Sequence, residues 1–465
     1  MRASKKDGIQ LIIKLVAIGL ILLFLFNEVG YLLDGASRCY PTGKTAEETD
    51  VVLIGSSHIY CDIIPQKLYD DYGITAYDVA PAEPGIKASY YAMKEVINSV
   101  QPQVIVVELL MMYENSVESD NMNFKTNLVH EMSLFSPVHY EAAIDCEESY
   151  EIGYDYYFDI LRAHTNYNDL TKDNFDKLSG TDLKAEQLGY KSTGKHKKAK
   201  DSKPYNYGDQ PSAGYEPIAE NVEYLDKMMA LASSKGVNVV FLLSPDSRAD
   251  HYDAFKWVDA HVQESGYRIY DFNTVEERET IEFDLETDMA DTNHLNDSGA
   301  LKYTEEIGSR LTSLFDLEDH RGQAGYEAWN SHQYNYESVM SAAKLSDTDN
   351  LADYLDLLAQ LNTDYVITIC AREQVEALSR TGVIDTGVEV LNGNAVQYDE
   401  KSICTNINTD KYDLNLGEEE EPITISINNK SKYSDEDAIA CILVYCSRTN
   451  EVVDSRSIGS DGEFM

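Results

Sequence analysis

The sequence predicts an α/β domain with a parallel sheet, preceded by an apolar N-terminal helix and followed by a smaller C-terminal domain that is β-rich or α/β. Three observations support this prediction. Short apolar runs alternate with segments of helical periodicity from about residue 50 to residue 316, at the spacing of parallel βαβ units. An apolar run long enough to be considered as a membrane span stands near the N-terminus. After residue 361, strand-like segments predominate.

The first βαβ units are expected between residues 50 and 110. Their strands are short and apolar without a polar face, which is typical of sheets that are covered on both sides. A strand of this kind at the start of the domain would lie in the middle of the fold. The predicted elements are a strand at 51–54, a helix at 63–72 that ends at Gly73, a strand at 74–79, a helix at 88–100 and a strand at 104–110.

The sheet domain, predicted at residues 36–316, contains an insertion at about residues 115–215 that breaks this rhythm. An insertion of this size above the carboxyl ends of the strands would serve as a lid or a substrate wall. Its aromatic run, Tyr150–Phe158, would suit stacking on sugar rings or, at helical spacing, a packed core. The expected elements are helical pieces near 139–146 and 156–164, then a helix at 218–235, a strand at 237–243, a helix at 252–265, a strand at 267–270 and a helix at 300–315.

The C-terminal third differs in character from the sheet domain. Residues 317–361 are expected to form a helical linker, and residues 362–465 a separate accessory domain. Alternating apolar and polar residues within that domain indicate strands. These strands are predicted at 365–371, 395–397, 423–427 and 438–446.

Residues 1–35 have the features of a signal anchor. Arg2, Lys5 and Lys6 precede an apolar run from Ile9 to Leu33, and positive charges mark the cytoplasmic side of a span. The uninterrupted part is short, but Lys14 can extend its side chain to the cytoplasmic face and lengthen the span. We therefore expect a single-pass protein attached to the lipid bilayer, with the rest of the chain extracytoplasmic. A cleaved signal peptide is the alternative.

Composition excludes several classes of function. The chain has 465 residues and a formal net charge of -43, so nucleic acid is not an expected partner, because phosphate binding needs clustered Lys and Arg. The seven cysteines are scattered and form no CxxC pair, so zinc and redox motifs are absent from the sequence. We predict that the protein uses neither a metal ion nor an organic cofactor.

The candidate chemistry lies at two separated motifs. Gly55-Ser56-Ser57 directly follows the first predicted strand, where α/β folds expose functional groups, and Asp291 and His294 stand three residues apart far downstream. A serine becomes a nucleophile when a neighbouring base takes its proton, and a carboxylate can orient that base. Ser57, His294 and Asp291 are therefore the candidate catalytic triad. Each motif taken alone is also compatible with an ordinary surface loop.

These motifs resemble those of the SGNH/GDSL hydrolase superfamily, and in particular its membrane-anchored bacterial DltD-like branch. The resemblance covers about residues 50–316. It implies a flavodoxin-like three-layer α/β/α domain, and ester hydrolysis or acyl transfer on cell-envelope carbohydrate at the bacterial cell membrane. For transfer, it also implies a membrane-embedded acyl exporter of the MBOAT type as a partner. The matching stretches are Gly55-Ser56-Ser57-His58-Ile59-Tyr60-Cys61, Tyr90-Tyr91-Ala92-Met93-Lys94-Glu95, and His294-Leu295-Asn296 with Gly299-Ala300 beyond.

The resemblance implies an oxyanion hole made of the nucleophile's own N–H, a glycine N–H and an asparagine side chain. Ser57 and Gly85 match the first two positions. After the third strand, Glu108-Leu109-Leu110-Met111-Met112 stands where the family has Gly-x-Asn-Asp, and Asn115 is the nearest asparagine. Loss of one oxyanion donor costs about a hundred- to a thousandfold in turnover. The middle motif is therefore where this chain departs from the family.

Three further residues have two interpretations each. His58 and His164 are candidates for contact with the substrate, or else structural histidines. Glu108, at the end of a strand, could orient the Ser57 turn by accepting backbone N–H bonds, or could face solvent.

The C-terminal domain carries a second, fainter resemblance, to the interleukin-like EMT inducer module. That resemblance implies a carbohydrate-associated accessory domain. It rests on Asp364-Tyr365-Val366-Ile367-Thr368-Ile369, Ile442-Leu443-Val444-Tyr445 and Asn450-Glu451-Val452-Val453-Asp454-Ser455.

The sequence thus supports two functional hypotheses of different classes. The first is a membrane-tethered, extracytoplasmic serine esterase or O-acyltransferase that acts on envelope glycan. The second is a non-catalytic glycan-binding or envelope-assembly protein that keeps the same scaffold, as the missing asparagine motif would allow.

Overall fold

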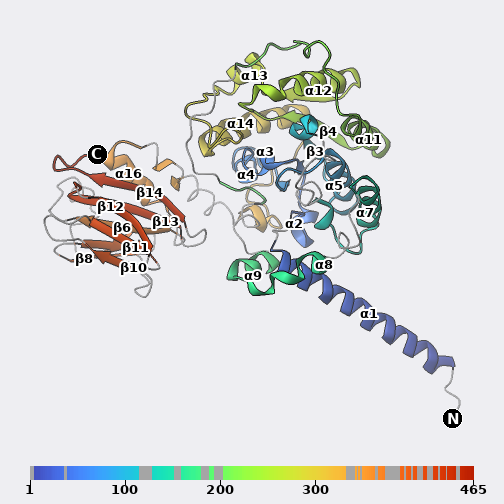
Figure 1. Ribbon diagram of the computed structural model, residues 1–465, viewed down its shortest axis with the longest axis horizontal. Coiled ribbons are helices and arrows are strands. Elements are labelled where there is room, and N and C mark those ends of the chain that lie inside the picture. Colours follow the sequence, from blue (N-terminus) through green and yellow to red (C-terminus); the bar gives the residue numbers. More distant parts are fainter. Residues whose placement is uncertain are drawn as a thin grey trace. The chain divides into compact units, whose positions relative to one another are not determined.

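The computed structural model divides the chain into two compact units, one made mostly of residues up to Asn330 and the other mostly of the residues after it (Figure 1). Each unit is described by itself below. The structure describes residues 5–35, 39–114, 128–150, 159–179, 188–192, 203–330, 341–342, 344–345, 348–361, 365–371, 388–391, 394–399, 402–405, 412–415, 423–427, 430–435, 437–446 and 451–465.

A five-stranded parallel sheet forms the centre of the first unit, in the order β2-β1-β3-β4-β5. This confirms the predicted α/β class, and the order is the one found in flavodoxin-like folds. Val51 pairs with both Ala76 and Val104, so the strands next to β1 end at the same edge as β1 does. The strands are β1 (Val51–Ile54), β2 (Ala76–Val79), β3 (Val104–Glu108), β4 (Asn238–Leu243) and β5 (Arg268–Asp271).

Helices pack on both faces of this sheet (Figure 1). Helices α4 (Pro65–Tyr72) and α14 (Asp297–Leu314) pack against each other, as do α5 (Ile86–Ser99) and α11 (Ala219–Lys235). Helix α4 ends at Gly73, which has a φ of 72° that glycine adopts without a Cβ clash. Other described elements of the unit are α2 (Gly43–Glu47), α3 (Ser57–Tyr60), η1 (Leu110–Tyr113), η5 (Ala249–His251), α12 (Tyr252–Glu264) and α13 (Val275–Thr280).

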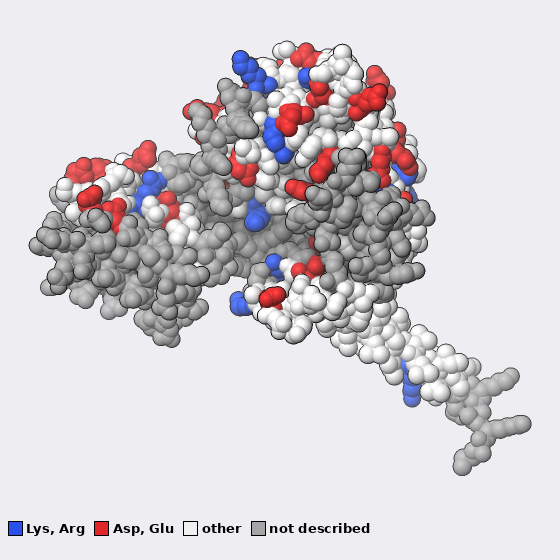
Figure 2. Space-filling model, viewed as in Figure 1, with Lys and Arg blue, Asp and Glu red and all other residues white. Residues whose placement is uncertain are grey.

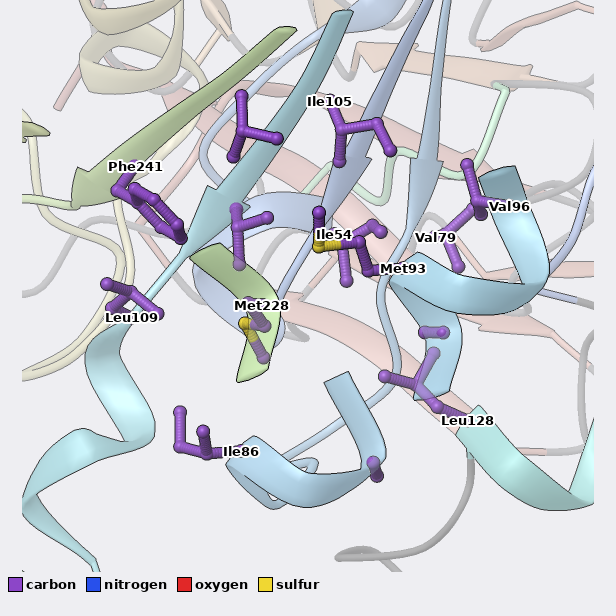
Figure 3. Packing of buried hydrophobic residues seen from close by; sticks show 14 of the residues in the cluster. Ile54, Val79, Ile86, Met93, Val96, Ile105, Leu109, Leu128, Met228 and Phe241 are labelled. Atoms are coloured by element: carbon purple, nitrogen blue, oxygen red, sulfur yellow. The ribbon is translucent and has the colours of Figure 1, made fainter. Parts of the chain in front are cut away.

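Alternate residues of the strands form a continuous apolar core with α5 and α11 (Figure 3). Ile54, Ile105 and Phe241 from three strands are fully buried and meet Met93 of α5 and Met228 of α11. Burying a side chain of this size contributes about 1.5–3 kcal/mol. Since the strands are buried on both faces, the ends of the strands form a rigid edge on which loops can place functional groups.

The insertion contributes helices that pack in two different places. Helix α7 (Pro137–Tyr150) packs against α5, whereas α8 (Asp159–Ala163), η4 (His164–Asn168) and α9 (Lys172–Ser179) pack against α1 (Lys5–Asp34). The rest of the predicted aromatic run, residues 151–158, lies outside the described residues.

Helix α1 is long and apolar enough to cross a membrane over Gly8–Asp34, and most of its side chains there are exposed, whereas Tyr31 and Leu33 near its end are buried. A signal sequence near the N-terminus has the same length and composition. The structure thus bears out the apolar helix that the sequence predicts.

The segment predicted as a linker at 317–361 is divided between the two units. Trp329 is fully buried in the core of the first unit and donates from its indole N–H to the Ala76 carbonyl, 3.1 Å away. His320 Nε2 lies 2.7 Å from an Asp50 carboxylate oxygen. A buried indole and its hydrogen bond attach residues 317–330 to the sheet domain, which the polar composition of this segment does not reveal.

The second unit is β-rich, and helix α16 (Leu351–Leu358) contributes to its apolar cluster. A six-stranded sheet has the order β14-β13-β6-β9-β8-β7, and a three-stranded antiparallel sheet the order β10-β11-β12. The strands are β6 (Tyr365–Ala371), β7 (Val388–Leu391), β8 (Asn394–Asp399), β9 (Ser402–Thr405), β10 (Tyr412–Asn415), β11 (Ile423–Ile427), β12 (Lys430–Asp435), β13 (Ala440–Cys446) and β14 (Glu451–Ile458).

Close packing of α4 on α14 leads to a first prediction. A Cβ atom on Gly308 would lie 2.3 Å from the ring of Tyr72 and 3.1 Å from Leu68. Gly308→Val is therefore expected to lower the free energy of unfolding of the sheet domain by about 1–3 kcal/mol, because overpacking forces the helices apart. Urea unfolding followed by tryptophan fluorescence measures this, since both tryptophans of the chain, Trp257 and Trp329, lie in the first unit.

Ser309→Val is the matched control, because Ser309 is the next residue on α14 and is exposed. Equal unfolding free energies for the two variants would contradict the inferred close contact.

Candidate active site

The candidate nucleophile lies on a tight turn between β1 and α3. Gly55 follows the strand, and a Cβ there would lie 2.7 Å from both Glu108 Cβ and Ile59 Cγ1, so only glycine fits. Ser56 caps the helix, since its hydroxyl accepts a hydrogen bond from the His58 N–H at 3.2 Å. Ser57 is the first residue of α3, stands at the carboxyl edge of the sheet and is 9% exposed.

A buried glutamate holds this turn in place. Glu108 is the last residue of β3, and its Oε2 accepts hydrogen bonds from the Ser56 Oγ at 2.9 Å and the Ser56 N–H at 3.3 Å. Its other oxygen accepts from the Leu110 N–H. Burial raises the pKa of Glu108 to about 7, while the hydrogen bonds from Ser56 and Leu110 oppose that rise. Of the two interpretations of Glu108, the structure therefore favours the one in which it orients the Ser57 turn.

The second motif lies on a compact loop between α13 and α14. The Asn296 N–H donates to the Asp288 carbonyl and the Ala290 N–H to the His294 carbonyl, both at 2.9 Å, which closes the loop on itself. The Asn296 side chain also accepts from the Gly299 N–H at 3.0 Å and so caps α14. Residues 288–296 thus form a closed loop that is anchored to the start of a long helix.

Two side chains fix this loop to the rest of the sheet edge. Asp62, which follows α3, accepts from the Leu295 N–H at 2.9 Å. Ser247, which follows β4, donates from its hydroxyl to the Thr292 carbonyl at 2.6 Å. The loop is therefore tied to the chain segments that follow both β1 and β4.

The fixed loop brings together residues that are 237 positions apart. His294 Nε2 lies 2.8 Å from Ser57 Oγ, and His294 Nδ1 lies 2.9 Å from Asp291 Oδ2. The other oxygen of Asp291 accepts from the backbone N–H groups of Asn293 at 2.6 Å and His294 at 3.0 Å. The three predicted triad residues thus form one continuous hydrogen-bonded chain with the geometry of a nucleophile, a base and an orienting acid.

The charge state of Asp291 suits its role beside His294. Burial acts to raise the pKa of Asp291, but the hydrogen bonds from His294 and Asn293 and the charge of His294 hold it well below its usual range. An ionised Asp291 favours the tautomer of His294 that carries its proton on Nδ1, which leaves Nε2 free to accept the Ser57 proton. The same carboxylate would stabilise the imidazolium that forms.

His58 lies behind His294 and not in a position to meet a substrate. Its side chain is 1% exposed, and its ring centroid lies 5.2 Å from that of His294. Burial and the nearby His294 lower the pKa of His58 to about 3, so its ring is neutral. Its Nδ1 lies 3.4 Å from Asp62, whose pKa burial raises well above its usual range. Of the two interpretations of His58, its burial favours the structural one.

His164, the other histidine considered for substrate contact, lies on the insertion. It lies exposed on η4, where its Nδ1 is 2.9 Å from the Leu161 carbonyl, and η4 packs against α1. The contacts of η4 with α1 and α8 thus place His164 on the insertion, and its expected contact with a substrate stays a prediction.

Two of the three predicted oxyanion donors, Ser57 and Gly85, lie within the described residues. Gly85 is buried at the start of α5, in the loop after β2, and its N–H has no acceptor among the described residues. Because β2 lies beside β1, this loop is at the same edge as Ser57. The Ser57 N–H also has no acceptor in the described part of the chain. Asn115 lies outside the described residues.

Sequence reasoning missed a polar cluster that follows β4. Asp246 is fully buried, and its carboxylate accepts from the Arg248 guanidinium at 3.0 Å and lies 2.8 Å from His251 Nδ1. Burial opposes ionisation of Asp246, but His251 and Arg248 lower its pKa to about 2. The Arg248 guanidinium lies 5.7 Å from the ring of Tyr113, which stacks on His251. The polar residues Ser244-Pro245-Asp246 at a strand end were the available signal.

An asparagine fixes the segment that follows β3. Asn221 of α11 is buried, and its amide donates to the carbonyls of Met111, Met112 and Glu114 at 2.9–3.3 Å. The backbone after β3 is thus held by a side chain from a distant helix, which no local sequence signal indicates. Among the described residues, no group of three or more His, Cys, Asp or Glu side chains is arranged to hold a metal ion.

Comparison with known proteins gives distant structural similarity only. No family model and no curated protein matches the sequence. Among solved structures, a putative lipolytic protein of the G-D-S-L family from Desulfitobacterium hafniense DCB-2 is similar at 10% identity and a TM-score of 0.29, over 56% of this chain and 98% of that one. A gut microbial diltiazem-metabolizing enzyme is similar at 12% identity and a TM-score of 0.20, over 59% of this chain and 49% of that one. At these scores the similarities carry no argument about function, which rests on the geometry above.

Burial of Glu108 generates a prediction about pH. Its folded pKa of about 7 exceeds the ordinary value of 4.5, so its contribution to stability is complete below about pH 4.5 and is lost as the pH rises through about 7. Glu108→Gln does not titrate. As the pH rises from about 4.5 to about 7, the free energy of unfolding of the wild-type protein should therefore fall relative to that of this variant. The expected decrease is on the order of 3 kcal/mol, which corresponds to the difference between the two pKa values.

The measurement is urea unfolding followed by tryptophan fluorescence at a series of pH values. The control is Glu264→Gln, at the exposed end of α12, for which no such change is expected. A difference between wild type and Glu108→Gln that stays constant with pH would refute the assignment of a buried, titrating Glu108.

Proposed function

We propose that this protein is an extracytoplasmic serine esterase or O-acyltransferase with Ser57 as its nucleophile. The observation that carries the proposal is the hydrogen-bonded chain from Ser57 Oγ through His294 to Asp291, at 2.8 and 2.9 Å. A serine, a histidine and a carboxylate in this order, at the carboxyl edge of a parallel sheet, have the roles of acyl-transfer catalysis.

In the first half of the reaction, Ser57 Oγ attacks the acyl carbonyl while its proton passes to His294 Nε2. Asp291 stabilises the imidazolium. As the tetrahedral intermediate collapses, His294 gives the proton to the departing alcohol, and an acyl-enzyme on Ser57 remains. In the second half, His294 removes a proton from water or from a sugar hydroxyl, which attacks the acyl-enzyme. As the second intermediate collapses, His294 returns the proton to Ser57 Oγ, and an acid or a new ester is released.

The negative charge on the oxygen of the tetrahedral intermediate requires hydrogen-bond donors that stabilise it. The N–H groups of Ser57 and Gly85 suit this role, because both lie at the same edge and neither has an acceptor among the described residues. We assign the third donor to Asn115, which follows the segment that Asn221 holds.

The cellular setting is part of the proposal. An uncleaved α1 would tether the protein to the bacterial cell membrane and keep the site outside the cytoplasm. The resemblance to membrane-anchored DltD-like proteins favours a cell-envelope glycan as the substrate and, for transfer, an MBOAT-type exporter as the acyl source. A carbohydrate-associated role for residues 362–465 would fit the same setting.

A second candidate function is a non-catalytic glycan-binding or envelope-assembly protein. The segment after β3 favours it, because Glu108 stands where the family carries Gly-x-Asn-Asp and its carboxylate is engaged in holding Ser56 and Leu110. In this case the triad would be retained without turnover.

A fluorophosphonate probe tests the two candidates. The full chain is treated with the probe, and peptide mass spectrometry locates the adduct. Catalysis predicts phosphonylation of Ser57 and its loss in His294→Ala. His261→Ala is the matched control, because His261 forms a similar pair with Asp226 at 2.7 Å on the surface without a serine, and labelling should remain. A folded protein that never labels would favour the binding protein.

The role of Asp291 gives a further prediction. Asp291→Asn keeps the size of the side chain but removes the charge and favours the wrong tautomer of His294. The rate of phosphonylation of Ser57 should fall by about 10³–10⁴-fold, with the unfolding curve unchanged. Asp226→Asn, at the surface His261 pair, should leave the rate unaltered. A similar rate for the two variants would contradict the orienting role of Asp291.

A further inference from the structure

We propose that α8, η4 and α9 form a membrane-contact collar around the end of α1, with Leu161, Tyr167 and Phe175 inserted at the lipid headgroup boundary. The inference rests on the proposed membrane-spanning role of α1. Its ligand is the outer surface of the same bilayer that α1 crosses.

Polar side chains attach the collar to the end of α1. The amides of Asn166 and Asn174 donate to the carbonyls of Leu33 and Leu32, each at 3.2 Å, and the Lys177 ammonium donates to the Gly35 carbonyl at 3.0 Å. The last carbonyls of a helix have no partner within it, so these bonds satisfy groups that would otherwise need water. The collar and α1 are therefore one packed structure.

The collar exposes large apolar side chains. Leu161 is 45% exposed, Tyr167 64% and Phe175 52%. Outside α1, seven large hydrophobic residues of the described chain are at least 45% exposed, and three of them lie on these elements, which pack against α1. Exposed apolar side chains on elements that pack against an apolar helix mark a membrane contact more readily than single residues scattered over the surface do.

The height of the collar along α1 agrees with this assignment. If the Lys14 ammonium reaches the cytoplasmic face, the 20 residues from there to Asp34 span about 30 Å at 1.5 Å per residue, which equals the hydrocarbon thickness of a bilayer. In Figure 1, α8 and α9 lie beside the end of α1 that is far from the N-terminus, so this placement puts the collar at the outer boundary. Aromatic residues such as Tyr167 are enriched at this level, and lysine side chains such as that of Lys177 extend toward the headgroups.

Charge on the visible surface is compatible with this position. In Figure 2, many acidic side chains lie on the upper part of the first unit, and the described part of α1 is white apart from one blue side chain. A net charge of -43 would repel an anionic lipid surface, so the acidic bulk of the domain is expected to face away from the bilayer while the collar faces it.

Consequently, α1 and the collar would hold the catalytic domain in a fixed orientation over the membrane. A single helix followed by an unattached chain would let the domain rotate freely, whereas two contacts in the same bilayer restrict it. The site would then act on acyl groups presented close to the membrane surface.

Fluorescence quenching in full-length protein tests the collar. The chain is placed in nanodiscs of phosphatidylcholine, with and without lipid that carries bromine both near the headgroup end and near the bilayer centre. Three variants are compared with the parent: Phe24→Trp on α1, Tyr167→Trp on the collar and Tyr207→Trp, whose position is 60% exposed on a loop elsewhere in the domain. Each variant adds tryptophan fluorescence to that of the parent. If the collar contacts the membrane, brominated lipid should quench the added fluorescence of Phe24→Trp and Tyr167→Trp and leave that of Tyr207→Trp unchanged.

The outcomes separate the collar from the span. Quenching of Phe24→Trp but not of Tyr167→Trp would overturn the collar and leave the membrane-spanning role of α1 intact, as expected if a protein partner covers the patch. Absence of quenching at Phe24→Trp would overturn both. Equal quenching at Tyr167→Trp and Tyr207→Trp would also overturn the collar, because the contact would then be unspecific.

Discussion

The hydrogen bonds of the buried Glu108 carboxylate are the interaction on which the candidate site most depends. They join the ends of β1 and β3, since the same side chain accepts from Ser56 on one side and Leu110 on the other. The absence of a side chain at Gly55 makes this close approach possible. Without this link, the start of the turn would lose its direct connection to β3, although Ser244 still donates to the His58 carbonyl further along α3.

The base is positioned by an independent set of contacts. Asp62 and Ser247 hold the loop of His294 from two sides, and Asn296 anchors it to α14. The rigid sheet therefore supports nucleophile and base separately, and their distance of 2.8 Å follows from two fixed loops at one edge. Pre-positioned groups of this kind avoid a cost of ordering when the substrate binds.

A neutral layer lies beneath the triad. His58 and Asp62 are buried side by side, and burial lowers the pKa of the first and raises that of the second, so both favour their uncharged forms. A neutral ring next to His294 does not compete with Asp291 for the imidazolium charge. The protein thus separates the ionised carboxylate that faces the base from buried groups that serve packing.

The sequence by itself determined the parallel α/β class, the apolar N-terminal helix and the position of most strands, because continuous apolar runs and helical periodicity are local signals. Its motifs also named Ser57, Asp291 and His294, whose separation in sequence says nothing about distance. Only the tertiary structure decided that these three meet, that His58 is buried and that His164 packs near α1, because each depends on contacts between segments far apart in the chain.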